Sequence, residues 1–328
     1  MKVLVTGATG FVGSHVVQKL LKLGHPVRVL RRANSSLKML EGLNVEHVIG
    51  DVTDRASVFK AVEGCDVVFH VAGYVTFWEQ NKALQDKINI DGTRNVVEAC
   101  LAHKVKRLIH TSSIAAIGYA PEGRLGDETI EYNWWPYRIN YNNSKYLAAE
   151  EVRQGIKQGL DAVMVNPAVI FGPGDLNLNG GAMVFQIARR KVPIYLASGG
   201  CCVCDVEDVA DGHILAWQKG KTGEKYILGG DNFNWKDLFT LIAEVVGVPP
   251  PRWKMPPWAN LAFGYGLDFA SKFTKKEPPL TSDLARISAV PVYYSSEKAI
   301  QELGYKISPF RETIRKTYEW YRENEYIK

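Results

Sequence analysis

The chain has 328 residues, of which 46% are hydrophobic and 23% are charged, and its formal net charge is +5. This length and composition predict a globular protein with a sizeable core, built as one large domain or two fused ones. The absence of a long basic run argues against a nucleic-acid partner, and the absence of a long apolar window argues against a membrane span.

The five cysteines are Cys65, Cys100, Cys201, Cys202 and Cys204. An odd number of cysteines, without a signal peptide before the first strand, predicts a reducing, cytoplasmic setting. The three clustered cysteines have no fourth nearby ligand and no C-x-x-C spacing, which argues against a metal site. We therefore interpret them as small apolar residues of a buried strand, and we expect no metal.

The N-terminus carries the strongest pattern in the chain. Residues 3–5 form an apolar run that predicts a buried strand, and a helical pattern follows it and ends near Gly24. Between them, Gly7 permits a tight turn, Gly10 lets the backbone approach phosphates, and Gly13 lets the helix lie close to the sheet. The free N–H groups of the helix N-terminus then favour an anion, so this unit predicts a dinucleotide site.

Strands and helices continue to alternate through the first half of the chain. Strands are expected at 27–30, 45–49, 66–73, 107–111 and 161–166, and helices at 55–62 (capped by Asp54), 84–103 and 141–156. This alternation predicts an α/β fold with a doubly wound parallel sheet, the Rossmann arrangement.

The pattern changes beyond Gly174, where a smaller interleaved C-terminal substrate domain is expected. A helix opens at 177–181 and runs to Arg190, a short strand at 203–206 leads into a helix at 209–218, and another strand lies at 226–228. We assign 1–170 and 204–230 to the dinucleotide-binding domain, and 171–203 and 231–328 to a substrate-binding lid. The least regular part is expected at 249–276, where 258–269 is apolar and about one short helix long.

The glycine spacing in TGATGFVG is G-x-x-G-x-x-G, which resembles the extended branch of the short-chain dehydrogenase/reductase family. The match to D-V-x-D-V-A at 205–210 extends this resemblance over nearly the whole chain. The small residues of 71–73 suit a chain that passes close under a cofactor. The cofactor-binding set that the motif and its neighbours imply is Gly7, Thr9, Gly10, Phe11, Val12, Gly13, Asp51, Val52, Val71, Ala72, Gly73, Lys145, Pro167 and Val169.

The strand at 27–30 ends in Arg31 and Arg32. In NAD-binding folds an acidic residue at this strand end binds the ribose 2′-hydroxyl, whereas an arginine accommodates the 2′-phosphate of NADP. We therefore expect NADP(H) as the cofactor, with NAD as the other option.

Tyr141 and Lys145 are four residues apart on one expected helix, so they share a face. A neighbouring ammonium favours the phenolate and lowers the pKa of a phenol, which then exchanges protons with a carbonyl or alcohol oxygen. Ser113, at the end of the neighbouring strand, can orient the same oxygen. These three residues match the serine–tyrosine–lysine triad of the family and are the expected catalytic residues.

The substrate region departs from the pattern of nucleotide-sugar enzymes. Nucleotide-sugar enzymes of the family usually carry an arginine just before the 205–210 motif, whereas residues 199–204 of this chain include none. The segment 166–173 instead resembles the corresponding segment of dihydroflavonol reductases and 3β-hydroxysteroid dehydrogenases. The chain as a whole, including Gly212-His213 and residues 226–230, also resembles hopanoid-associated sugar epimerase-like chains. We expect an oxidoreductase that interconverts a ketone or aldehyde and an alcohol on an apolar substrate. The alternatives are an NAD-dependent nucleotide-sugar epimerase or dehydratase and a non-enzymatic redox sensor.

Aromatic residues near the carboxyl end of the sheet suit an apolar pocket, with core packing as the alternative for each: Tyr74, Phe77, Trp78, Trp134, Trp135, Tyr137 and Phe185. The segment 258–269 either walls this pocket, which we favour, or lies on a membrane surface. His70, at a strand end, is interpreted as a core histidine rather than an acid or base. The family resemblance implies a homodimer formed through the helices at 84–103 and 140–157.

Overall fold

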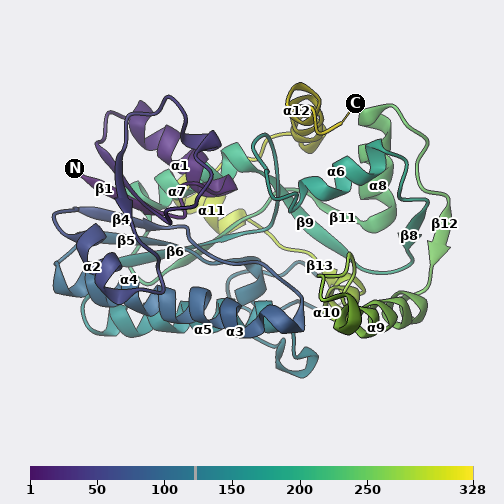
Figure 1. Cartoon of the computed structure of the whole chain (residues 1–328), viewed down its shortest axis with the longest axis horizontal. Helices are drawn as coiled ribbons and strands as arrows, with labels where there is room; N and C mark the ends of the chain where they lie inside the picture. The colour runs from purple at the N-terminus through teal and green to yellow at the C-terminus, as the bar shows by residue number, and fades with distance from the viewer. Residues whose placement is uncertain (122–123, 328) are drawn as a thin grey trace.

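The computed structural model describes residues 1–121 and 124–327. Its main feature is a seven-stranded parallel sheet in the order β10-β6-β5-β4-β1-β2-β3 (Figure 1). The strands are β1 (Val3–Thr6), β2 (Val27–Arg31), β3 (Glu46–Ile49), β4 (Val67–His70), β5 (Arg107–Thr111), β6 (Ala162–Pro167) and β10 (Lys225–Leu228). The predicted doubly wound sheet is therefore confirmed.

Helices cover both faces of this sheet and bury two separate cores. The five principal ones are α1 (Phe11–Lys22), α2 (Arg55–Val62), α4 (Gly92–Ala102), α5 (Asn140–Lys157) and α7 (Val206–Lys219). Val3 and Val5 join the core that includes residues of α1 and α7, whereas Leu4 joins the core that includes residues of α2, α4 and α5. Because successive side chains point to opposite faces, one apolar run supplies both cores.

The helix expected at 84–103 is present but has a local irregularity. It begins as α3 (Lys82–Asp86), passes through a π-helical turn over Lys87–Asp91, and continues as α4. The π-helical turn brings Asn89 into the buried interior. Such turns are frequent at functional sites, and this one borders the site described below.

The rest of the chain forms two small sheets and further helices at the other end of the molecule (Figure 1). Their strands are β7 (Val169–Phe171), β8 (Ile194–Leu196), β9 (Gly200–Asp205), β11 (Asn232–Asn234), β12 (Trp253–Met255) and β13 (Pro291–Val292). Their helices are α6 (Gly181–Ala188), α8 (Trp235–Val246), α9 (Pro257–Thr274), α10 (Ser282–Ser288), α11 (Glu297–Leu303) and α12 (Phe310–Glu323).

Several expectations for this half need correction. The strand expected at 203–206 begins already at Gly200, and the next helix begins at Val206 rather than at 209, because Asp205 caps it by accepting a hydrogen bond from Glu207 N at 2.7 Å. The segment 249–276 is not irregular, since most of it is the 18-residue helix α9. The domain boundaries stay a prediction, although β10 joins the large sheet and β9 a small one.

Cys201, Cys202 and Cys204 are buried and unbonded to one another in β9, which confirms their interpretation as strand residues. Burial raises the pKa of each of these thiols. Within the described ranges, no helix combines the length and the hydropathy that crossing a bilayer requires.

Candidate functional site

The turn between β1 and α1 has no room for side chains at its glycines. Gly7 has a φ of +70°, and a Cβ there would lie 2.6 Å from Ala72 N. A Cβ on Gly13 would lie 2.2 Å from Gly7 O, and Gly10 N donates a hydrogen bond to the same oxygen at 2.9 Å. The three glycines therefore permit a backbone contact that other residues would prevent.

This turn leaves the N-terminus of α1 ready for an anion. Gly10 is the N-cap and offers no side chain to the first N–H groups, and the first turn of α1 holds no acidic residue. Phe11 is buried against the His15 ring, while Thr9 and Val12 are partly exposed beside the turn. Unpaired N–H groups and the helix dipole favour a phosphate at this point, so the turn fits a dinucleotide diphosphate.

The residues expected near the adenosine half lie at the same carboxyl edge of the sheet. Arg31 ends β2 and donates from Nε to His47 Nδ1 at 3.1 Å, and Arg32 next to it is exposed. Asp51 Oδ1 accepts hydrogen bonds from both the N–H and the hydroxyl of Thr53, each at 2.9 Å. Val52 is buried beside Gly92.

Tyr141 and Lys145 lie in the first two turns of α5. Ser113 is the second residue after the end of β5. Lys145 is buried and donates from Nζ to Thr111 O, the last carbonyl of β5, at 2.9 Å. Ser113 Oγ accepts a hydrogen bond from Ala115 N at 3.1 Å. The expected triad is thus brought together where α5 meets the end of β5.

Burial sets the acidity of the two ionisable groups in this triad. It lowers the pKa of Lys145 to about 8, because the interior disfavours the ammonium. Burial also raises the pKa of Tyr141, while a hydrogen bond with the Ser113 side chain acts in the opposite direction. At neutral pH, therefore, Lys145 remains protonated and Tyr141 keeps its phenolic proton.

Asn89 was not among the residues expected in the site, yet it joins three parts of it. Its Oδ1 accepts from Tyr74 N at 2.8 Å, and its Nδ2 donates to Ser144 Oγ at 3.0 Å. A Cβ on Gly73 would lie 3.5 Å from Lys145 Nζ and 3.6 Å from Asn89 Oδ1. Asn89 is thus a positioning residue that holds the loop after β4 against α5. Its signal in the sequence is its place at the start of 89–95, which resembles the N-x-x-G-T-x-N helix of the extended short-chain dehydrogenase/reductase family.

His70 is a core residue, as expected. It is fully buried, with Nδ1 2.7 Å from Thr6 Oγ1 and Nε2 3.0 Å from Thr93 Oγ1. Burial, with a contribution from the charge of Lys145, lowers its pKa to about 3. The ring is therefore neutral at physiological pH, and its hydrogen bonds join β4 to Thr6 of β1 and to Thr93 of α4.

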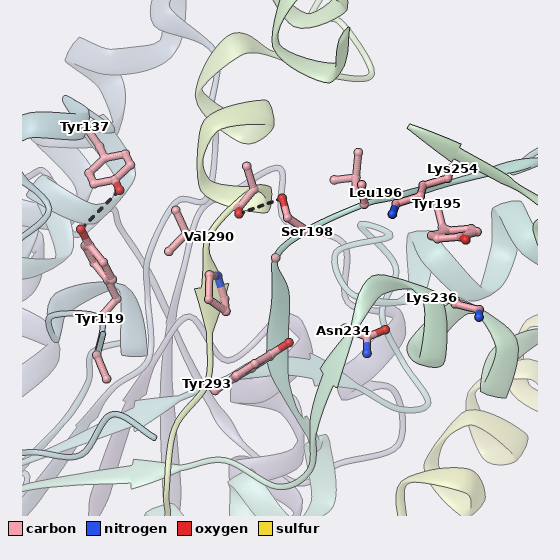
Figure 2. A pocket seen from close by; sticks show the side chains of 15 residues that line it. Tyr119, Tyr137, Tyr195, Leu196, Ser198, Asn234, Lys236, Lys254, Val290 and Tyr293 are labelled. Carbon is pink, nitrogen blue, oxygen red and sulfur yellow. Dashed lines mark hydrogen bonds between the residues drawn. The ribbon is translucent and has the colours of Figure 1, made fainter. Parts of the chain in front are cut away.

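A cavity of about 780 Å³ lies next to the segments that lead out of Ser113 and into Tyr141. Figure 2 shows Tyr119 and Tyr137 on one side of it, with hydroxyl oxygens 3.3 Å apart. Its other principal lining residues are Tyr195, Leu196, Asn234, Lys236, Lys254, Val290 and Tyr293. Among the lining residues that the structure describes there is neither an arginine nor a carboxylate.

Most of the aromatic residues expected to line a pocket serve other purposes. Of the seven, only Tyr137 lines this cavity. Trp134 is completely buried and donates from Nε1 to Ile117 O, as core packing requires. Phe77 lies edge-on to the Tyr141 ring, with centroids 5.5 Å apart, so it does border the triad. No residue of 258–269 lines this cavity, and the expectation that the segment walls the substrate pocket stays a prediction.

The parallel sheet, the glycine turn and the triad define a class: dinucleotide-binding enzymes that oxidise or reduce carbon–oxygen groups. The model of the NAD dependent epimerase/dehydratase family matches residues 3–229. The chain therefore belongs to this family, the extended short-chain dehydrogenase/reductases, and is an NAD(P)-dependent enzyme acting on CH–OH groups.

Known proteins are similar to this chain over almost its full length. A protein of Synechocystis sp., provisionally named dihydroflavonol 4-reductase, is 34% identical over 329 residues, covering 99% of this chain and 95% of its own. Sterol demethylase protein B of Methylococcus capsulatus is 29% identical over 330 residues, covering all of both chains. The crystal structure of gox2253 superposes with a TM-score of 0.87 at 35% identity, covering 99% of each chain.

We expect Gly13→Ala to abolish dinucleotide binding, because its Cβ would lie 2.2 Å from Gly7 O and push α1 away from the turn. Titration calorimetry with NADPH and NADH measures the loss. Gly24→Ala is the control, since Gly24 lies just after the end of the same helix and has nothing near its Cβ position; its φ of +77° makes the control the more strained backbone position of the two. Wild-type affinity in Gly13→Ala would contradict this assignment of the turn.

Proposed function

We propose that the protein is an NADP(H)-dependent oxidoreductase that interconverts a ketone or aldehyde with an alcohol on an apolar, flavonoid-, steroid- or terpenoid-like substrate. The observation that carries the proposal is the meeting of Ser113, Tyr141 and Lys145 beside the glycine turn.

The residues of the turn fit the cofactor. The glycine turn leaves the first N–H groups of α1 for the diphosphate, and Arg31 and Arg32, at the end of β2, would pair with a 2′-phosphate. When bound, the nicotinamide supplies or accepts the hydride.

The chain's own residues handle the proton. In the direction of reduction, Tyr141 Oη donates its proton to the carbonyl oxygen as that oxygen gains charge, and the C=O bond becomes C–OH. Ser113 Oγ donates a hydrogen bond to the same oxygen and orients it. The Lys145 ammonium, held by Thr111 O, stabilises the phenolate left behind. Oxidation of the alcohol reverses each step.

Within the described residues, the lining of the cavity lacks the arginines that would hold the diphosphate of a nucleotide sugar. A diphosphate is best held by bidentate arginines, and the described lining offers only Lys236 and Lys254 as cations. Arg286 lies nearby, but it donates to Tyr137 O at 2.7 Å and pairs with Asp283. The names of the similar dihydroflavonol and sterol proteins support the proposed substrate class.

Replacing Tyr141 by Phe tests the proposed chemistry. NADPH oxidation with a panel of flavonoid and steroid ketones is expected to fall by about a hundredfold to ten-thousandfold, because the proton donor is lost. NADPH affinity should stay near that of the wild type. Tyr146→Phe, on the same helix but facing Tyr132, is the matched control and should keep activity. Unchanged turnover in Tyr141→Phe would overturn the assignment.

The reduction rate is expected to depend on the charge of Lys145. Its pKa of about 8 means that the ammonium is present below this pH and is lost as the pH rises through it. Since the ammonium stabilises the developing phenolate, kcat for ketone reduction should decline above about pH 8. A pH–rate profile at saturating NADPH measures this, and a flat profile up to pH 10 would contradict it.

Cofactor preference tests the two arginines. Arg31→Asp combined with Arg32→Ala is expected to lower NADPH affinity by about tenfold to a hundredfold, because charge-assisted hydrogen bonds to the 2′-phosphate are lost. NADH affinity should change little. Lys22→Ala removes a cation from the far end of α1 and serves as the control. Equal NADPH and NADH affinities in the wild type, with NAD retained on purification, would instead favour the epimerase.

A further inference from the structure

Helix α9 presents its polar and small residues to the protein and its aromatic residues outward. The inner face carries Asn260, Gly264 and Ser271, all buried against neighbouring elements. Asn260 Nδ2 donates to Ser288 Oγ at 3.3 Å, and a Cβ on Gly264 would lie 3.0 Å from Thr281 O. The arrangement is the reverse of an ordinary surface helix, whose apolar stripe faces the core.

The outer face of α9 carries Trp258, Tyr265, Phe269 and Phe273, spaced seven, four and four residues apart so that they share one side of the helix. They are 54–75% exposed, and the rings of Phe269 and Phe273 are 5.3 Å apart. We call these four residues the aromatic ridge. Trp253, at the start of β12, is also exposed. Soluble surfaces seldom expose so many large rings together unless something covers them.

The charge beside the aromatic ridge is positive. Lys272, Lys275 and Lys276 lie at the C-terminal end of α9, are exposed, and form no ion pair within the described ranges. The only acidic residue of α9 is Asp268, and it accepts a hydrogen bond from Ser282 N at 2.9 Å. Glu277 follows Lys276 and accepts a hydrogen bond from Thr76 Oγ1 at 3.0 Å. The three lysines therefore outnumber the two carboxylates near them, and both carboxylates are already hydrogen-bonded within the protein.

We propose that the aromatic ridge docks on an anionic phospholipid bilayer, with its rings at the headgroup level and the three lysines on lipid phosphates. Tryptophan and tyrosine have an apolar body and a polar tip that suit this interface. Helix α9 lies at the outer edge of the molecule beside α10, away from the seven-stranded sheet, so a flat surface can reach it (Figure 1). This inference does not depend on the proposed reaction.

A second copy of the chain fits the same face less well. In a two-fold dimer the ridge and its three lysines would face an identical patch, whose two carboxylates, Asp268 and Glu277, are fewer than the lysines and already hydrogen-bonded. An anionic surface matches the same charge. Charge complementarity therefore selects the bilayer over the dimer.

Vesicle flotation tests the proposal on the full-length protein, with phosphatidylcholine vesicles compared with equal parts of phosphatidylcholine and phosphatidylglycerol. Wild type should float with the anionic vesicles, and less at high ionic strength. Phe269→Ser combined with Phe273→Ser should reduce partitioning by about tenfold or more, because two rings no longer leave water. Lys272→Glu combined with Lys275→Glu should reduce it on anionic vesicles alone.

Leu125→Ser and Lys306→Glu, exposed elsewhere, are the matched controls and should bind as the wild type does. All variants should keep the wild-type melting temperature and NADPH affinity, since none of these residues lies in the site. The proposal is overturned if wild type does not float with anionic vesicles, or if the phenylalanine variant floats equally well. It is also overturned if that variant merely converts a dimer to a monomer in sedimentation velocity.

Discussion

The structure depends on one close approach of backbone to backbone. The loop after β4 runs so near the turn after β1 that a Cβ on Gly7 would collide with Ala72, while Gly13 lies directly over the Gly7 carbonyl. This contact sets the start of α1 at the carboxyl edge of the sheet. It also holds residues 71–73 beside Lys145, so this loop borders both the expected cofactor site and the triad.

A second constraint is the burial of Lys145. An ammonium in the interior must be hydrogen-bonded, and the Thr111 carbonyl at the end of β5 meets that need. The same bond fixes α5 relative to β5 and therefore the distance between Tyr141 and Ser113. Asn89 completes this frame by joining the loop after β4 to Ser144. Stability and chemistry thus rely on the same few hydrogen bonds.

Features set by local patterns could be predicted from the sequence. Short-range spacing predicts the glycine turn, the parallel sheet, the core role of His70 and the shared face of Tyr141 and Lys145. The structure shows each of these arrangements. Strands of two or three residues such as β13 have too few positions to show alternation, and they exist only through pairing with β9.

Other features depend on tertiary contacts that no local pattern records. The cavity draws Tyr119, Tyr195 and Tyr293 from segments far apart in the chain. Helix α9 was expected to be short and to wall a pocket, because aromatic residues ordinarily face inward. In the structure its polar face is buried instead, since Asn260 and Ser271 find partners on α10 and in the loop after β4.

The central claim is that the site carries out a net reduction of its substrate, with the hydride leaving in the product. The most direct measurement is mass spectrometry of the product after turnover of a ketone substrate with NADPH that carries deuterium at both C4 positions of the nicotinamide. The account predicts one deuterium in each alcohol formed and one NADP⁺ released for each. A cofactor that stays bound and unchanged in redox state, with an isomerised sugar nucleotide as the product, would contradict it.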